Sequence, residues 1–385
     1  MKRAFWFGIL AACTLLPAQA QRTTVEESGV RSKSFKVSKG GMLDVSTSVG
    51  DIRISPWGKE EVYVSVEGLD EEDLDRLKMT QSGNTVRVSF RPRWGDYGGS
   101  VRFDINVPSA FDLRLKTAGG DLTIDNGLQG KVDGSTAGGN IKLGSIKGDI
   151  EMSTSGGDIT SGDFSGNGYL HTSGGDINLG KVGGTLEVST SGGDIRVEYV
   201  AKSLEAKTSG GDIEVGDVGG ETSVSTSGGD IRVGSVSGKA SLSTSGGNVE
   251  LKGASGVVSA RTSGGDIHLV NISGSVDART SGGEVDAELN PTGKGSSRLV
   301  SSGGKIRLYL PEQAKATVEA AIRVHGSWGR RSDRYKIKSD FTAESYDRDE
   351  DEEEIRAVYK LNGGGERIEL ETVNSDIEIL KSRKR

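Results

Sequence analysis

The sequence predicts an all-β fold, a parallel β-solenoid (β-helix) built from 18-residue coils, with less regular β caps at both ends. The peptide T-S-G-G-D-I or a close variant recurs through residues 119–310, and its second glycine returns with a constant 18-residue period from Gly139 to Gly283. A fixed period of this kind is typical of stacked repeats, because each unit has an apolar face that only a neighbouring unit can bury.

The interior of one repeat indicates what each coil contains. In residues 228–244 the apolar residues alternate with polar ones, first at Ile231 and Val233 and then at Ala240 and Leu242. A period of two is typical of a strand, so each coil is expected to hold two strands of about five residues separated by corners. We expect the glycine pairs at these corners, where a positive φ and a close backbone approach would both penalise a Cβ atom.

The alternation also predicts a register for the strands. Arg196, Glu214 and Arg232 should be exposed, and a slip of one residue would exchange the buried and exposed sets. The residues expected in the core are Ile195, Val197, Leu204, Ile213, Val215, Val224, Ile231, Val233 and Leu242.

Residues 1–20 are predicted to be a secretory signal peptide. Lys2 and Arg3 precede an apolar run, and Pro-Ala-Gln-Ala supplies an A-x-A cleavage site before Gln21. The alternative is lipoprotein processing, because Leu-Ala-Ala-Cys resembles a lipobox whose cysteine, Cys13, would carry a lipid anchor. Cys13 is the only cysteine, so cleavage before Gln21 would leave a mature chain without disulfide or thiol chemistry.

Residues 21–118 and 311–385 are predicted to be β regions that cap the solenoid. Diverged copies of the repeat open and close the mature chain at residues 47–54 and 372–379. One continuous domain is therefore favoured over three separate ones. Covers are needed at solenoid ends, because exposed strand edges would otherwise pair with other chains.

Two details of the N-terminal cap are predicted. An acidic stretch at residues 69–77 is expected to form a short helix. Most of the early aromatic residues, Trp57 and Trp94 among them, fall in this region and suit a bulky cover over the narrow end of a rod.

The C-terminal cap contains an acidic loop, predicted at residues 347–354. It begins with D-x-D-x-D like an EF-hand loop, but Glu352 stands where that loop needs glycine and Val358 where it needs glutamate. A solvated charged loop is therefore favoured over a calcium site. Strands are expected around it at residues 316–324, 335–341, 355–361 and 368–370.

Aspartates that follow the glycine pairs are candidate metal ligands. Glycine-rich nonapeptide repeats carrying Asp bind calcium, and the repeat in this chain is twice as long as a nonapeptide. Here Asp follows the glycine pair directly, and one carboxylate per coil falls short of the roughly six to eight oxygens that calcium takes. The alternative is that each side chain accepts a backbone N–H at the corner, which explains why Asn140 and Asn248 occupy the same slot. The candidates are Asp158, Asp176, Asp194, Asp212, Asp230 and Asp266.

Composition narrows the class of function. The net charge of -7 argues against nucleic acid or anionic lipid as a partner. No second apolar run is long enough for a transmembrane helix. His171, His268 and His325 are scattered and have no cysteine partner, so no zinc site is expected. No catalytic or cofactor-binding residue is predicted, and the expected partner is an unidentified protein or glycan surface.

The T-S-G-G-D-I repeats, the Gly-Asp-Ile of residues 50–52, the Asn-Ser-Asp-Ile of residues 374–377 and the signal peptide together resemble the bacterial DUF4097 family of β-strand-repeat proteins, which are described as adhesins. The resemblance covers nearly the whole mature chain. It implies an exported, non-enzymatic cell-envelope protein, located in the periplasm, on the outer membrane surface or outside the cell. It carries over no catalytic residues.

Two functional hypotheses follow. The first is an adhesin or binding scaffold that presents a regular solenoid surface. The alternative is a carbohydrate-active β-helix enzyme acting on envelope or environmental glycans. Such an enzyme should show a carboxylate cluster in a groove with aromatic walls, whereas a scaffold should show uninterrupted ladders.

Overall fold

The computed structural model describes residues 23–26, 30–93, 101–292, 295–325, 334–349 and 353–382. The predicted signal peptide with Cys13 and Gln21 lies outside the described residues, and so do Trp94 and Glu352.

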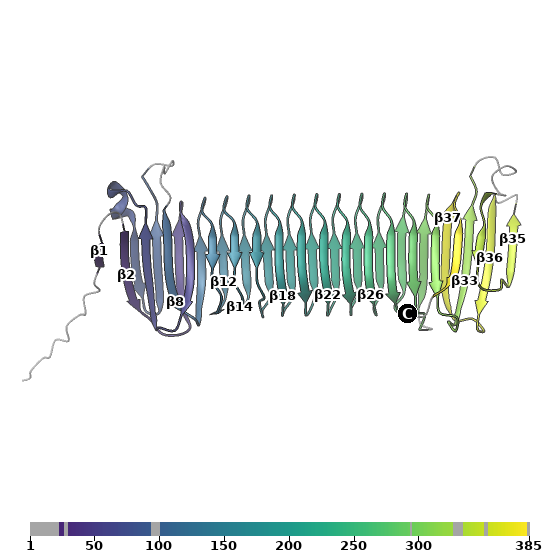
Figure 1. Ribbon diagram of the computed structural model, residues 1–385, viewed down its shortest axis with the longest axis horizontal. Coiled ribbons are helices and arrows are strands. Elements are labelled where there is room, and N and C mark those ends of the chain that lie inside the picture. Colours follow the sequence, from purple (N-terminus) through teal and green to yellow (C-terminus); the bar gives the residue numbers. More distant parts are fainter. Residues whose placement is uncertain are drawn as a thin grey trace, which may run out of the picture.

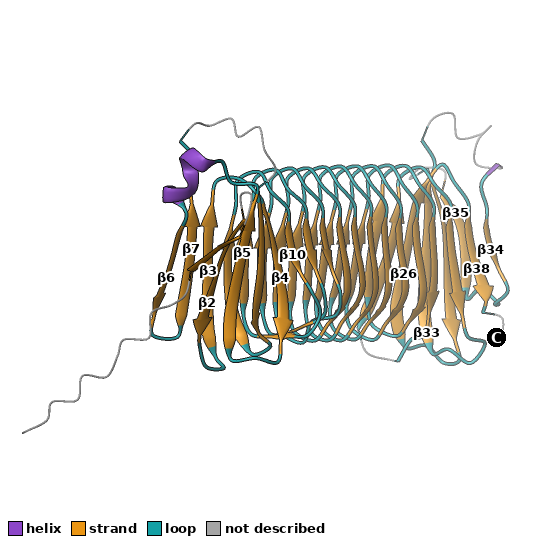
Figure 2. Ribbon diagram, turned by 60° about the vertical axis from the view of Figure 1, so that its left-hand side comes forward, coloured by secondary structure: helices purple, strands orange, loops and turns teal. Residues whose placement is uncertain are grey.

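The described chain forms a long rod in which two sheets run side by side along the axis (Figures 1 and 2). The 18-residue period becomes the strand register, because Ile195 pairs with Ile177 on one side and with Ile213 on the other. Strand pairings within the described part of residues 122–310 are parallel throughout. The predicted parallel β-solenoid is confirmed.

Each regular coil gives one strand to each sheet. The first sheet holds β10 (Leu122–Ile124), β13 (Ile141–Leu143), β16 (Ile159–Ser161), β18 (Ile177–Val182), β20 (Ile195–Val200), β22 (Ile213–Val218), β24 (Ile231–Val236), β26 (Val249–Ala254), β28 (Ile267–Ile272), β30 (Val285–Leu289) and β32 (Ile306–Leu310). The second sheet holds β12 (Val132–Ser135), β15 (Ile150–Ser153), β17 (Gly168–His171), β19 (Leu186–Ser189), β21 (Leu204–Lys207), β23 (Thr222–Ser225), β25 (Ala240–Ser243), β27 (Val258–Arg261), β29 (Val276–Thr280) and β31 (Ser296–Ser301).

The core register agrees with the sequence prediction. All nine residues expected in the core are at most 4% exposed. Arg196, Glu214 and Arg232 point to solvent. The strands alternate as predicted because their inward residues stack on the same residue of the next coil.

A further buried position escaped the sequence prediction. After Val197 two exposed residues follow, Glu198 and Tyr199, and Val200 then returns to the core. The strand bends at this point, so strict alternation fails and the third inward residue is out of phase. In the first coils the same position lies in the short strands β11 (Leu128–Gln129) and β14 (Ile146–Lys147). Its buried equivalents are Leu128, Ile146, Phe164, Val182, Val218, Val236, Ala254 and Ile272.

The opening copy of the repeat is built into the stack. It forms β3 (Gly41–Thr47) and β4 (Asp51–Trp57), which pair in parallel with β9 (Phe111–Lys116) and β10. On its other side lie β7 (Thr85–Phe90) and β8 (Arg102–Pro108), also parallel. The opening coil is therefore held between two coils that come later in the chain.

Antiparallel strands cover the N-terminal end. β2 (Val30–Lys36) pairs with β1 (Thr23–Glu26) and with β5 (Glu61–Glu67), and β6 (Lys78–Ser82) pairs with β7. The expected acidic helix is a 3-10 helix, η1 (Glu71–Arg76). Trp57 is half-buried and donates from Nε1 to the Glu61 carbonyl at 2.7 Å. The fully buried aromatic residues of this end are Phe35, Phe90, Phe103 and Phe111.

The C-terminal end repeats the arrangement. The closing copy forms β37 (Glu366–Val373) and β38 (Ile377–Lys381). It lies between the coil of β31 and β32 and the coil of β33 (Ala316–Arg323) and β34 (Ile337–Ser339), with parallel pairing on both sides. At each end a coil is thus clamped by segments distant from it in sequence.

An antiparallel hairpin covers this end. β36 (Glu354–Leu361) pairs with β33 and with β35 (Ser345–Asp349). The acidic loop predicted at residues 347–354 was therefore wrong in its bounds. Asp347 lies in a strand opposite Arg356, so cross-strand pairing orders the start of the acidic run.

Candidate functional site

The corner aspartates hydrogen-bond to the backbone of the next coil. Oδ1 of Asp158 accepts the N–H of Asp176 at 2.8 Å, and Oδ1 of Asp176 accepts the N–H of Asp194 at 2.8 Å. The side-chain oxygens of Asn140 and Asn248 accept in the same way, at 2.9 and 2.8 Å. One side-chain acceptor per coil is what the slot requires, so Asp and Asn both fit.

The six candidate metal ligands therefore lie along the rod in different coils, and Asn248 takes the slot between Asp230 and Asp266. A second oxygen of Asp194 accepts from Arg196 at 2.9 Å, and one of Asp230 accepts from Arg232 at 2.6 Å. Among the residues that the structure describes, no group of three or more His, Cys, Asp or Glu side chains converges as a metal site would require. The arrangement supports a structural role for the ladder.

A second ladder at the corner was missed by the sequence analysis. Thr190 Oγ1 donates to the Gly175 carbonyl of the preceding coil at 2.9 Å and accepts the N–H of Gly193 at 3.3 Å. Thr208 repeats both bonds one coil further on. The available signal was the threonine that stands three positions before the second glycine in most repeats.

Close approach explains the second glycine of each pair. A Cβ atom on Gly211 would fall well inside contact distance of the Gly193 carbonyl oxygen, and one on Gly193 would meet Gly175 in the same way. The expectation of a positive φ at these pairs was wrong, since none of the regular corner glycines has one. Gly50 in the opening coil does, at φ 95°.

The exposed face of the first sheet carries a row of polar side chains whose charges alternate in sign from Arg196 to Glu250 and again from Asp286 to Lys338, with His268 between the two runs. Neighbouring strands place opposite charges beside each other, as with Arg196 Nε and Glu214 Oε2 at 3.9 Å. Burial opposes the charge on Arg307, but Asp286 and Glu284 outweigh it and raise the pKa of its guanidinium above the ordinary value. The row runs Arg196, Glu214, Arg232, Glu250, His268, Asp286, Arg307, Glu378 and Lys338.

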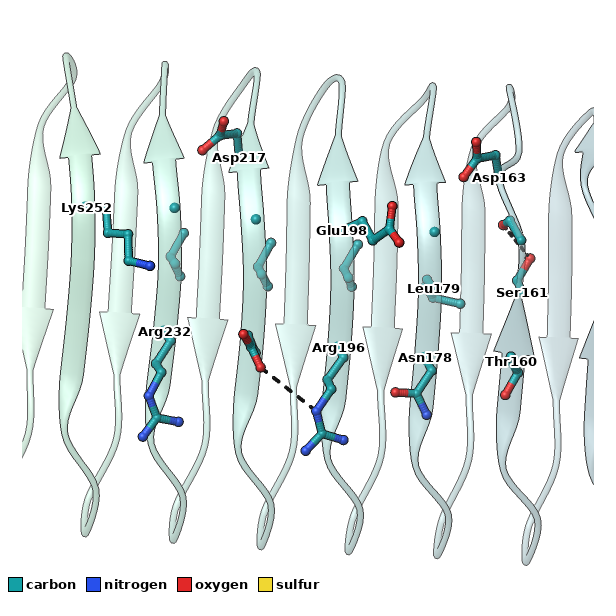
Figure 3. A pocket seen from close by; sticks show the side chains of 18 residues that line it. Thr160, Ser161, Asp163, Asn178, Leu179, Arg196, Glu198, Asp217, Arg232 and Lys252 are labelled. Atoms are coloured by element: carbon teal, nitrogen blue, oxygen red, sulfur yellow. Dashed lines mark hydrogen bonds and ion pairs between the residues drawn. The ribbon is translucent and has the colours of Figure 1, made fainter.

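A groove of about 780 Å³ crosses six coils of the same sheet, from β16 to β26 (Figure 3). Its floor is largely backbone, because glycine recurs five positions after the second corner glycine. Glu198 and Lys252 replace glycine in two coils and project between the walls. The floor glycines are Gly162, Gly180, Gly216 and Gly234.

Two rows of side chains wall the groove. One row comes from the residue after the first inward isoleucine of each strand, and Figure 3 shows it in Thr160, Asn178, Arg196 and Arg232. The opposite row contains Asp163 and Asp217.

An adjoining hollow of about 540 Å³ shares Asp163 with the groove. Lys147, Lys181 and Tyr199 line it over the backbone of the bent strand ends. The two hollows therefore lie next to each other on the surface. Sequence reasoning did not find them, although the recurring floor glycine was a usable signal.

The histidines are dispersed over the surface. His268 and His325 are exposed. His171 is half-buried, with Nδ1 2.9 Å from Ser189 Oγ. No helix in the described part of the chain has the length and apolar character needed to cross a membrane.

The chain was compared with family models, with curated proteins and with solved structures. No curated protein matches it. Similar solved structures include a "putative cell adhesion protein" of Clostridium sporogenes, at 10% identity over 92% of this chain and 100% of the other, with a TM-score of 0.17. A "putative adhesin" of Bacteroides fragilis is 12% identical over 92% and 97%, with a TM-score of 0.25.

A third solved structure, a "putative lipid binding protein" of Parabacteroides distasonis, is 11% identical over 93% of this chain and 98% of the other, with a TM-score of 0.21. TM-scores this low give no basis for transferring a role. The Toastrack DUF4097 family model matches residues 41–216 and 184–380, which together span well over half of the sequence, and the chain belongs to that family.

Proposed function

We propose that this chain is an exported, non-enzymatic binding scaffold of the cell envelope, an adhesin in the broad sense, that contacts its partner through the groove on the first sheet. The observation that carries the proposal is the groove itself. It is a continuous hollow over six coils, walled by side chains that point away from the core.

The contrast between repeated frame positions and varied groove positions supports this role. Corner and core positions repeat from coil to coil, because the hydrogen-bond ladders and the close packing require it. The wall positions change at each step, from Thr160 to Asn178, Arg196, Glu214 and Arg232. A uniform frame with a varied outer row is suited to specific recognition of a partner.

The state of the groove carboxylates favours binding over catalysis. Oδ1 of Asp163 accepts the N–H of Lys181 at 2.8 Å, and Oδ1 of Asp217 accepts the N–H of Ser235 at 2.7 Å. Glu214 faces Arg196. Glycoside hydrolysis needs two carboxylates with separate acid and base roles. Of the four carboxylates that line the groove, these three are engaged with the frame or with a neighbouring cation, which leaves Glu198 without a second carboxylate to complete such a pair.

Co-sedimentation with envelopes tests the proposal. The mature protein, residues 21–385, is mixed with washed envelopes of the producing bacterium and centrifuged. We expect saturable binding that weakens when Arg196→Ala and Tyr199→Ala are combined. The combination of Arg279→Ala and Tyr169→Ala should leave binding unchanged, since both residues lie on the second sheet.

Two outcomes would refute the proposal. One is protein that stays in the supernatant at every concentration. The other is release of soluble sugar from the envelopes during incubation, which would favour the carbohydrate-active enzyme.

A further inference from the structure

We infer that the ligand of the groove is an extended, neutral glycan chain laid along the rod, with successive sugar residues over successive coils. The inference rests on the proposed binding function and names the class of ligand. Neighbouring parallel strands are about 4.8 Å apart, so six coils offer a track of about 24 Å with one set of contacts per step. A periodic track of this kind fits a linear polymer with a repeat of similar length, and a pyranose residue has such a length.

The shape of the floor favours a chain that lies flat. In four of the six coils, Gly162, Gly180, Gly216 and Gly234 leave the floor without side chains, so a ligand can approach the backbone there. Glu198 rises from the same line between Gly180 and Gly216, and Lys252 stands at the end of the line, in β26. They offer an acceptor and a donor within the floor, where ring hydroxyls would lie.

The charges of the groove argue against an ionic polymer. Four carboxylates and three cations line it, and the two signs alternate along the Arg196, Glu214 and Arg232 row. A polyanion would therefore meet a carboxylate in three of the six coils, and a polycation would meet a cation in three of them, which is destabilising at this spacing. Hydroxyl groups both donate and accept, so carboxylates, guanidinium groups and the Asn178 amide can all bind them. The charged lining residues are Asp163, Glu198, Glu214, Asp217, Arg196, Arg232 and Lys252.

One aromatic side chain is placed to contact sugar rings. Tyr199 lines the adjoining hollow and is 38% exposed. It follows Glu198 in β20, and it pairs with Lys181 of β18 on one side and with Asp217 of β22 on the other. An exposed ring presents a flat apolar face that can pack on the C–H face of a sugar. Tyr169 is 46% exposed but lies on the second sheet, away from the groove, and so supplies a matched control.

The charged contact also has a close control. The side chains of Arg196 and Arg279 are both 49% exposed, and each pairs with the aspartate two positions before it, Asp194 or Asp277. Arg196 lies in the groove and Arg279 on the second sheet. Alanine at either position removes the same charge and an ion pair of the same kind. Arg196→Ala also removes the 3.9 Å contact with Glu214, which is itself part of the groove wall, so a difference between the two variants reports on the groove.

The experiment uses envelopes of the producing bacterium as the probe and treats them in two ways. Proteinase K removes protein, and periodate cleaves the C–C bonds between vicinal hydroxyls of sugars to give aldehydes. We expect the mature protein to co-sediment with protease-treated envelopes and to lose binding after periodate. The neutral polysaccharide fraction released from the envelopes should compete, and the acidic fraction should not.

Variants locate the site. Arg196→Ala and Tyr199→Ala should each weaken binding to protease-treated envelopes about tenfold, which corresponds to about 1.4 kcal/mol. Arg279→Ala and Tyr169→Ala should bind as the parent does. Equal effects of the groove and control variants would overturn the location, and competition by the acidic fraction would overturn the neutral class.

The outcomes separate this inference from the proposed function. Binding that is lost after proteinase K and survives periodate would show a protein partner, which overturns the glycan and leaves the scaffold role standing. Failure to bind untreated envelopes would overturn both.

Discussion

Replacing Thr208 by valine tests the threonine ladder. Its hydroxyl donates to the Gly193 carbonyl at 2.9 Å and accepts the Gly211 N–H at 3.4 Å, and the side chain is 6% exposed. Valine keeps the shape but leaves a buried carbonyl and a half-buried N–H without these bonds. Leaving a buried polar group unsatisfied costs about 1–3 kcal/mol. The carbonyl accounts for most of this cost, because the bond from the N–H is the longer and weaker one. Thr208→Val should therefore lower the free energy of unfolding by about 2–3 kcal/mol.

Thr222 provides the matched control. It is 4% exposed in β23, between Leu204 and Ala240 of the neighbouring strands, and its hydroxyl has no hydrogen-bond partner among the described residues. Removing a buried, unpaired hydroxyl relieves a desolvation cost, so Thr222→Val should stabilise by about 1 kcal/mol. Thr208→Ser keeps the ladder and should lose only about 1 kcal/mol, for one methyl group.

Urea unfolding followed by circular dichroism, with hydrogen exchange on the peptides of this coil, measures the effect. Exchange is included because long repeat arrays can open locally before they unfold as a whole. Equal shifts for Thr208→Val and Thr222→Val would refute the ladder as a source of stability.

Three further predictions concern packing, charge and processing. Gly211→Ala should destabilise by about 3 kcal/mol, because its Cβ would collide with the coil below. Gly210→Ala, whose Cβ would stand 3.2 Å from a carbonyl oxygen, should cost at most about 1 kcal/mol; equal urea midpoints for the two would contradict the packing argument. Glu214→Arg would place three guanidinium groups on adjacent strands, and it should lower the free energy of unfolding by about 1 kcal/mol at low salt and by less at high salt. A loss of stability that does not change with salt would contradict the stabilising role of the alternating charges. N-terminal sequencing of protein from the producing bacterium should begin at Gln21 without lipid, whereas an acylated Cys13 at the N-terminus would show lipoprotein processing.

The regular part of the fold could be predicted because one pattern is written many times. Ile213 and Ile231 lie at the same point of an 18-residue period and alternate with Glu214 and Arg232, so period and register follow together. The hydrogen-bonding role of the corner Asp could also be predicted, because Asn140 occupies the same slot and the property that Asn and Asp have in common is a side-chain oxygen acceptor.

What could not be predicted depends on contacts between coils. Val200 enters the core only because the strand bends after Val197, and alternation along the sequence gives no sign of the bend. The glycine pairs were assigned partly for the wrong reason, because the obstacle to a side chain at Gly211 is the backbone of Gly193, one full repeat earlier in the sequence.

The two ends show the same limit. The closing copy of the repeat could be recognised from residues 372–379, but its place between two earlier coils depends on which edge the returning chain meets. The groove likewise arises from side chains of six coils that come together only when the rod is wound.

The most direct measurement concerns the corner carboxylates. Aspartates stacked at about 4.8 Å would repel by roughly 1 kcal/mol per neighbouring pair in water, and that repulsion needs an offset. In this structure the N–H groups of the next coil supply it, together with cations such as Arg196 beside Asp194.

Thermal unfolding in excess EDTA, followed by circular dichroism and repeated with millimolar calcium, decides between these hydrogen bonds and a bound cation. We expect a folded β spectrum in EDTA and a melting temperature that calcium does not move. An unfolded spectrum in EDTA that recovers when calcium is added would contradict the structural role of the ladder and show that Asp158, Asp176 and their equivalents are metal ligands.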